Sequence, residues 1–150
     1  MKMNWKYDSS CVFCRLLQDG FPLKICDLKV SVAALHRDQY FYGRCLLVLK
    51  WHEVELYNLS EDERAAFFED MIVVARALKS ALKPDKMNYA VLGNVVPHLH
   101  WHLIPRFKSD PLWGRPIWAE PHDEKVLSNA EYEELIEIIR KCIQGIRGVV

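Results

Sequence analysis

The chain has 150 residues, of which 51% are hydrophobic and 27% are charged, and its 20 acidic side chains balance its 20 lysines and arginines. This length and composition predict a single domain, residues 1–150, with a hydrophobic core of its own. The net charge of zero excludes a general electrostatic attraction to nucleic acid or to an anionic membrane, so we expect neither as a partner.

The N-terminal stretch, residues 1–10, is polar and lacks the apolar segment of a signal peptide. No run of the sequence approaches the roughly 18 apolar residues that a membrane-spanning helix needs. The five cysteines are an odd number with irregular spacing, which argues against a disulfide framework and for a reducing compartment. We therefore expect a cytoplasmic protein without a membrane partner.

The next segment begins with Cys11 and Cys14, a Cys-x-x-Cys pair that leads into a brief helix ending near Gly20. Residues 25–35 are apolar and β-branched, which predicts two short strands. Residues 45–49, Cys-Leu-Leu-Val-Leu, predict a strand that is buried on both of its faces.

The clearest helix of the sequence covers residues 59–82, where apolar side chains recur at helical spacing. Ser60 followed by Glu63 forms a capping box at its start, and Pro84 stops it. Residues 89–92 then predict another strand.

Strict alternation of polar and apolar residues predicts a strand over residues 98–104, ended by Pro105. Residues 108–123 are rich in Pro, Gly and Trp and predict an irregular segment. Ser128 and Glu131 form a second capping box that opens a C-terminal helix.

These elements predict an α+β fold: a mostly antiparallel five-stranded sheet, one long helix packed on it and a helix at the C-terminus. The core of the domain is expected to span residues 11–110, and residues 111–150 hold the Trp/Pro segment and the terminal helix.

The alternating strand places His98, His100 and His102 on one face, opposite leucines and a tryptophan. Burying a polar group without a partner costs roughly 1–3 kcal/mol, so these rings are expected to have partners or to face a site. Neighbouring rings on one face of a strand would lie about 6.6 Å apart, and the outer two about 13 Å apart. One metal ion with ligand bonds of about 2 Å hardly holds all three, so the three rings are predicted to have different roles.

Cys11 and Cys14 have the spacing of a zinc knuckle, which needs two further ligands. The sequence has no second Cys-x-x-Cys pair, so the partners must be histidines, and either His52 or His98 can supply one. The alternative is a pair of reduced thiols without a metal.

A histidine becomes a competent nucleophile toward phosphorus when a hydrogen bond fixes its other ring nitrogen. His100 is the natural candidate because it has a histidine on each side. Asn94, beside Gly93, is a candidate donor to a phosphoryl oxygen, although a Gly-Asn turn also has a plain structural explanation.

The sequence His98-Leu-His100-Trp-His102-Leu-Ile resembles the signature of the histidine triad (HIT) family of nucleotide hydrolases and transferases. The following Pro105-Arg106 is similar to the ending found in the branch that cleaves dinucleoside polyphosphates. Residues 43–52 resemble the family's upstream block of glycine, histidine, an apolar run, proline, lysine and a second histidine.

The resemblance implies a covalent nucleotidyl-histidine on His100, formed by attack on the α-phosphorus of a small nucleotide and released by water as a nucleoside monophosphate. It implies that His102 binds the phosphate and helps the leaving group, and that the His98 region orients His100. The substrate would be a dinucleoside polyphosphate or a nucleoside phosphoramidate, and the protein would be a homodimer whose two sheets join side by side.

For members with the N-terminal Cys-x-x-Cys, the resemblance implies a structural zinc ion held by four residues. They are Cys11, Cys14, His52 and His98. This set agrees with the ligands that the spacing alone allows.

The chain also departs from the family pattern. Arg44 stands where the family commonly has histidine, and Val95 where many members have a serine or threonine that contacts phosphate. His36, next to Leu35, takes the place of the acidic residue that usually holds the ribose, so these two join Asn94 as the predicted substrate-binding residues. Trp113 and Trp118 could cover the site and stack on the nucleotide, or line a dimer interface.

Two alternatives remain open at this point. The altered phosphate and ribose positions fit a nucleotide-binding or interaction module of the same fold with little activity. A cupin-like metalloenzyme would use His98 and His100 as ligands, but it needs a glutamate shortly after them, and the next acidic residues are Asp110 and Glu120.

Overall fold

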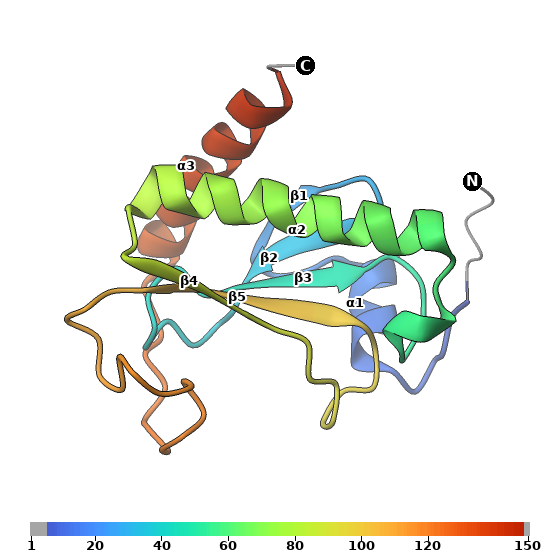
Figure 1. Cartoon of the computed structure of the whole chain (residues 1–150), viewed down its shortest axis with the longest axis horizontal. Helices are drawn as coiled ribbons and strands as arrows, with labels where there is room; N and C mark the ends of the chain where they lie inside the picture. Colours follow the sequence, from blue (N-terminus) through green and yellow to red (C-terminus); the bar gives the residue numbers. More distant parts are fainter. Residues whose placement is uncertain (1–5, 149–150) are drawn as a thin grey trace.

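Five antiparallel strands form one sheet in the spatial order β1-β2-β3-β5-β4 (Figure 1). The structure is a computed structural model that describes residues 6–148, so residues 1–5 of the polar N-terminal stretch, on which the expectation of no signal peptide partly rests, lie outside it. The strands are β1 (Lys24–Asp27), β2 (Ser31–Leu35), β3 (Cys45–Leu49), β4 (Lys86–Ala90) and β5 (His100–Arg106). This sheet confirms the predicted α+β class.

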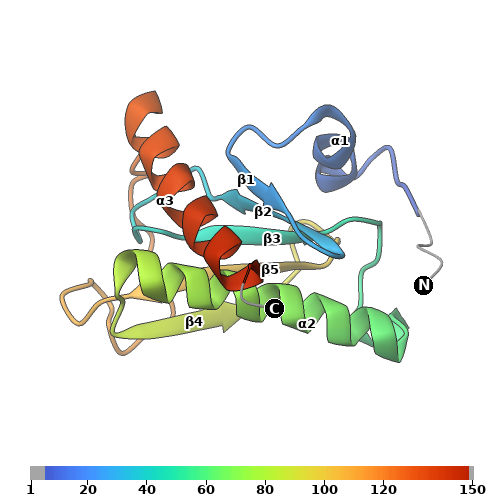
Figure 2. The ribbon, with the colours of Figure 1, turned by 90° about the horizontal axis from the view of Figure 1, so that it is seen from above.

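Helices cover both faces of the sheet, but unequally. They are α1 (Val12–Asp19), α2 (Glu61–Leu82) and α3 (Asn129–Arg147), with a short 3-10 helix, η1 (Leu56–Asn58), before α2. Figures 1 and 2 show α2 and α3 together on one face, whereas α1 lies on the other. The irregular segment after β5 also lies on the α1 side (Figure 1).

Both predicted capping boxes are present at the starts of the two long helices. The hydroxyl of Ser60 accepts from the backbone N–H of Glu63 at 3.3 Å, and the Glu63 carboxylate accepts from the Ser60 N–H at 2.8 Å. Ser128 and Glu131 repeat this exchange at the start of α3. Such caps satisfy backbone donors that a helix leaves free at its N-terminus, so they fix where α2 and α3 begin.

The alternation along the two central strands separates a hydrophobic core from a polar face. Leu47 of β3 and Trp101 and Leu103 of β5 belong to the core beneath α2 and α3. The residues between them, among them Val48 and His100, point to the α1 side. The expected division of the histidine strand into an apolar and a histidine face is therefore correct for the residues inside β5.

The predicted ends of two strands were wrong. β5 begins at His100 rather than at His98, and it continues through Pro105 to Arg106. Beyond Leu103, which pairs with the first residue of β3, β5 has no partner on that side in the described part of the chain, and a proline is tolerated where one side of a strand is unpaired. β4 runs from Lys86 to Ala90 instead of over residues 89–92, because its register follows this longer β5.

β4 is an edge strand of the sheet, so its outer side has no partner strand among residues 6–148. The homodimer with joined sheets stays a prediction. Over residues 6–148, no helix has the length and hydropathy that crossing a bilayer requires.

Candidate active site and metal centre

Three buried histidines lie at the start of β5, where the chain enters the sheet from the loop over residues 91–99. His98, His100 and His102 have exposed fractions of only 1%, 6% and 9%. The rings of His100 and His102 meet on the α1 side of the sheet, with their Nε2 atoms 3.1 Å apart. The ring of His98, which precedes the strand, lies instead among cysteines.

Hydrogen bonds assign the proton positions of the two strand histidines. Nδ1 of His100 lies 2.6 Å from the carbonyl oxygen of His98, so Nδ1 carries the proton and donates it. Nε2 of a neutral His100 is then an acceptor, and the Nε2–H of His102 donates to it. Nδ1 of His102 is left as an acceptor, and Arg44 Nη2 donates to it at 3.3 Å. This chain of hydrogen bonds runs from Arg44 through His102 and His100 to the His98 carbonyl, and within it the lone pair of His100 Nε2 accepts from His102.

Burial keeps these imidazoles neutral. It lowers the pKa of His102 to about 3, and the positive charge of Arg44, together with that of His100 once protonated, acts in the same direction. Burial also lowers the pKa of His100 below its ordinary value of 6.5, against the opposing effect of the His98 carbonyl. A neutral His100 keeps the unshared electron pair that a nucleophile needs.

A cavity of about 350 Å³ opens beside these rings. Phe13 of α1 walls one side and packs edge-on against His100, with ring centroids 4.9 Å apart. Trp118 closes another side and lies edge-on to His102 at 5.2 Å. The remaining lining residues are His36, Leu46, Leu92, Gly93, Asn94, Val95 and Val96.

A second cavity of about 520 Å³ shares Phe13, His36 and Leu46 with the first. It is mostly apolar and is walled by α1, β2 and the start of α3. Leu35 and Tyr132 are among its lining residues. Since the two cavities share walls, a polar site at the histidines adjoins an apolar one of a size that suits a planar ring system.

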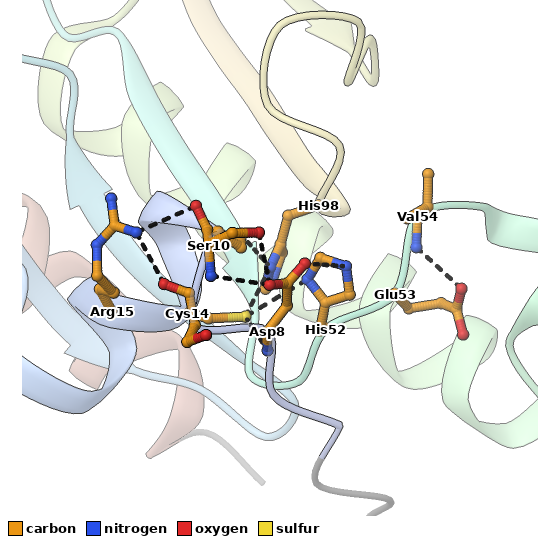
Figure 3. A network of polar contacts seen from close by, with 10 residues as sticks. Asp8, Ser10, Cys14, Arg15, His52, Glu53, Val54 and His98 are labelled. Carbon is orange, nitrogen blue, oxygen red and sulfur yellow. Dashed lines mark hydrogen bonds and ion pairs between the residues drawn. The ribbon is translucent and has the colours of Figure 1, made fainter.

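The predicted metal-ligating residues lie together at the start of α1, and Figure 3 labels Cys14, His52 and His98 among them. Cys11, Cys14, His52 and His98 each offer one ligand atom, and these four atoms all lie within 4.8 Å of one another. The Nδ1 of His98 is 3.4 Å from Cys11 Sγ and 3.6 Å from Cys14 Sγ. Tetrahedral zinc with bonds of about 2.0–2.3 Å separates neighbouring ligand atoms by roughly 3.3–3.8 Å, so these residues can hold such an ion.

The surroundings of the cluster orient its histidines as ligands. Nε2 of His98 donates to the carbonyl oxygen of Leu49 at 2.8 Å, which leaves Nδ1 unprotonated and facing the cysteines. His52 likewise presents Nδ1 to Cys14 at 3.4 Å, while its Nε2 lies 3.8 Å from the Asp8 carboxylate (Figure 3). A carbonyl or carboxylate behind a ligating imidazole is the usual second contact of a metal-bound histidine. The donor set and its support therefore fit a metal ion.

The residues predicted to bind substrate lie around the two cavities. His36 lines both of them, and Leu35 lines the larger one. Asn94 is exposed on the loop before β5 and lines the smaller cavity. Of the two tryptophans, Trp118 faces the histidines, whereas Trp113 lines a separate surface hollow beside β4.

Two site residues had no assigned role in the sequence analysis. Phe13 lies between Cys11 and Cys14, and the sequence analysis treated it only as one of the residues that separate the two cysteines. Arg44 was noted only as a departure from a family pattern, yet it is 6% exposed and contacts both His102 and Trp118. The sequence signal for a role of Arg44 was an arginine just before an apolar strand. Its contact with the histidines follows only once β3 is known to pair with β5.

The comparisons with known proteins agree with this geometry. The family model of the HIT domain matches residues 23–109. The chain is 31% identical over 127 residues to the adenosine 5'-monophosphoramidase HNT1 of Saccharomyces cerevisiae, covering 78% of this chain and 77% of that protein. It is 28% identical over 139 residues to the adenylylsulfatase HINT3 of Arabidopsis thaliana, covering 89% and 69% of the two chains.

A similar solved structure is that of a histidine triad protein from Bradyrhizobium japonicum. It superposes with a TM-score of 0.77 at 34% sequence identity and covers 93% of this chain and 98% of the other. The family model, the relatives and the fold lead to one conclusion: this chain belongs to the histidine triad family.

Proposed function

We propose that the protein is a nucleotide phosphohydrolase that acts through a covalent nucleotidyl-histidine on His100. The observation that carries this proposal is the direction of the hydrogen bonds around that ring. The Nδ1–H of His100 donates to the His98 carbonyl at 2.6 Å. Its Nε2 lies beside His102, on the face of the sheet where the 350 Å³ cavity opens. The named activities of the relatives support a nucleotide substrate, since one is a phosphoramidase and another an adenylylsulfatase.

In the first step, the electron pair on His100 Nε2 attacks the α-phosphorus. The bond from phosphorus to the leaving group breaks, and its electron pair departs with that group. As Nε2 turns to the phosphorus, the Nε2–H of His102 is freed to donate to a phosphoryl oxygen. Water then attacks the same phosphorus, the P–N bond breaks, and a nucleoside monophosphate leaves with His100 restored.

The two cavities divide the substrate between them. The nucleoside is expected in the apolar 520 Å³ cavity, with Leu35 and His36 in its wall, and the phosphate in the cavity at the histidines. Asn94 lines the cavity at the histidines from the loop before β5 and is proposed to donate to the phosphate. His36 replaces an acidic side chain with a neutral imidazole, whose pKa burial and Arg44 lower.

The cluster of Cys11, Cys14, His52 and His98 is proposed to hold a structural zinc ion. All four ligand positions are filled by side chains, which is typical of closed structural sites rather than of catalytic ones. The bound ion would link the start of α1 to the loop before β5. The carbonyl of His98 would then be fixed for its bond to His100.

The direct test is turnover of diadenosine polyphosphate and adenosine phosphoramidate by His100→Ala and His100→Asn. We expect AMP release to fall at least a thousandfold while AMP still binds, because the cavities stay intact. Cys142→Ala, at a half-buried thiol on α3, is the control and should leave turnover unchanged. Turnover near that of the wild type in either His100 variant contradicts the mechanism, and binding without any turnover by the wild type favours a nucleotide-binding module.

A further inference from the structure

One buried side chain near the site carries a charge that no carboxylate neutralises directly. Arg44 precedes β3 and is 6% exposed, and its Nε has no hydrogen-bond partner within residues 6–148. Among the residues that the structure describes, its guanidinium makes no ion pair with an acid. Leaving such a donor unsatisfied costs free energy, so the position calls for a role in function.

The surroundings of Arg44 are those of the phosphate site. Its Nη2 lies 3.3 Å from Nδ1 of His102, and its guanidinium carbon lies 5.5 Å from the ring centroid of Trp118. Both of these rings line the cavity at His100. A guanidinium keeps its charge at every physiological pH, whereas an imidazole at this position would be mostly neutral.

Asp38 is the acid whose charge acts on Arg44, but other donors already occupy its carboxylate. Its carboxylate accepts from the backbone N–H groups of Tyr40 and Lys125 and from the ring of His122. The guanidinium of Arg44 therefore has no hydrogen bond to Asp38 and contacts His102 and Trp118 at the site instead.

We propose that Arg44 is a specificity-determining residue that makes the site prefer nucleotides with an anionic leaving group, such as phosphate or sulfate anhydrides, over phosphoramidates. This inference rests on the proposed function and adds the chemical class of the substrate. When the P–O bond of an anhydride breaks, the leaving oxygen keeps the electron pair and departs as an anion, which a fixed cation stabilises. An amine leaves only after its nitrogen gains a proton, and a nearby cation opposes that protonation.

Arg44 acts through His102 and through its charge, so it is a positioning residue and not a catalytic one. At an effective dielectric constant near 20, a unit charge within about 6–7 Å of a developing anion changes the rate of its formation by roughly tenfold to a hundredfold. This estimate applies to the anhydride reaction only. If the substitution only damaged the fold, the rates of the anhydride and phosphoramidate reactions would fall together.

The test compares kcat/KM for diadenosine triphosphate and for adenosine 5'-phosphoramidate in the wild type, Arg44→Gln and Arg44→Lys. We expect the wild type to prefer the anhydride. In Arg44→Gln, kcat/KM for the anhydride should fall at least tenfold while that for the phosphoramidate changes less than threefold, and Arg44→Lys should restore part of the preference. A wild type that prefers the phosphoramidate, or an unchanged ratio in Arg44→Gln, overturns the proposal.

A binding measurement separates this proposal from the proposed function. Calorimetry gives the ratio of the ADP and AMP affinities for the same three proteins, with thermal melting as the check of folding. We expect that ratio to favour ADP in the wild type and to fall at least fivefold in Arg44→Gln. If the wild type hydrolyses neither substrate, the proposed function fails, and this ratio alone decides the role of Arg44: an unchanged ratio overturns it.

Discussion

The carbonyl oxygen of His98 accepts a 2.6 Å hydrogen bond from Nδ1 of His100. The same residue turns its own Nδ1 toward Cys11 and Cys14, at 3.4 and 3.6 Å. His98 therefore connects the candidate metal cluster to the proposed nucleophile through one residue. The backbone of His98 fixes the tautomer of His100, and its side chain fixes that backbone.

This connection predicts that metal loss affects chemistry as well as stability. In Cys14→Ser, we expect bound zinc to fall from about one per chain to near zero, as measured by elemental analysis. The melting temperature should fall, and kcat should fall by about tenfold to a hundredfold, the range found when contacts that orient a site are lost. KM should change less, because Cys14 does not line the cavities at the histidines.

Cys142→Ser is the matched control for this variant. Cys142 is a half-buried free thiol on α3 and is not part of the Cys-His cluster. It should keep its zinc and its kcat. A Cys14→Ser protein with unchanged zinc content and melting temperature would show that the four residues hold no metal.

Burial of His102 predicts a loss of stability in acid. Its pKa is about 3 in the folded protein and near 6.5 in the unfolded chain, so the unfolded chain binds more protons between these values. The stabilisation by neutral His102 is complete above about pH 6.5 and decreases as the pH falls toward 3. One proton contributes a slope of up to about 1.4 kcal/mol per pH unit to the free energy of unfolding.

The measurement is denaturant unfolding at several pH values from 4 to 7 for the wild type and His102→Gln. The variant lacks this titrating group, so its free energy of unfolding should decrease less steeply with falling pH. Groups that titrate in both proteins, such as His98, contribute equally to the two slopes. Identical slopes would mean that His102 does not titrate between the folded and unfolded states as burial requires.

The hydrogen bonds of Asp38 are expected to anchor the irregular segment that carries Trp118. Its carboxylate accepts from the N–H groups of Tyr40 at 2.9 Å and Lys125 at 3.0 Å, and from His122 Nε2 at 2.8 Å. Asp38→Asn replaces one acceptor with a donor, so we expect a loss of about 1–3 kcal/mol in stability. Hydrogen exchange at the Lys125 amide should become faster than in the wild type.

The control for this variant is Glu137→Gln, which removes an exposed ion pair with Arg140 on α3. An exposed pair contributes about 0–1 kcal/mol, so this change should leave both stability and exchange nearly unaltered. If Asp38→Asn behaves like Glu137→Gln, the buried carboxylate does not anchor the segment.

The helices and the central strand were predictable because local signals determine them. The capping boxes at Ser60 and Ser128 mark helix starts through contacts within four residues, and both are present. The strand over residues 45–49 has the predicted limits because an apolar run of that length suits a buried strand. The start of β5 was misplaced, since His98 leaves the strand to join residues that are distant in sequence.

The composition of the candidate site was only partly predictable. Spacing and resemblance indicated the Cys-His cluster, and the structure brings its four side chains together. The contact between Arg44 and His102 depends on the register of β3 against β5, where Leu46 lies opposite His102. The placement of Trp118 beside them depends on an irregular segment without a periodic pattern, so its sequence gave no indication of which tryptophan faces the site.

The central claim is that His100 becomes covalently bound to a nucleotide. The most direct measurement is the intact mass of the protein after brief mixing with diadenosine polyphosphate or adenosine phosphoramidate, quenched without acid. We expect a gain of one adenylyl group in the wild type and none in His100→Ala. AMP release by the wild type without such an adduct, or an adduct that persists in His100→Ala, would contradict the account.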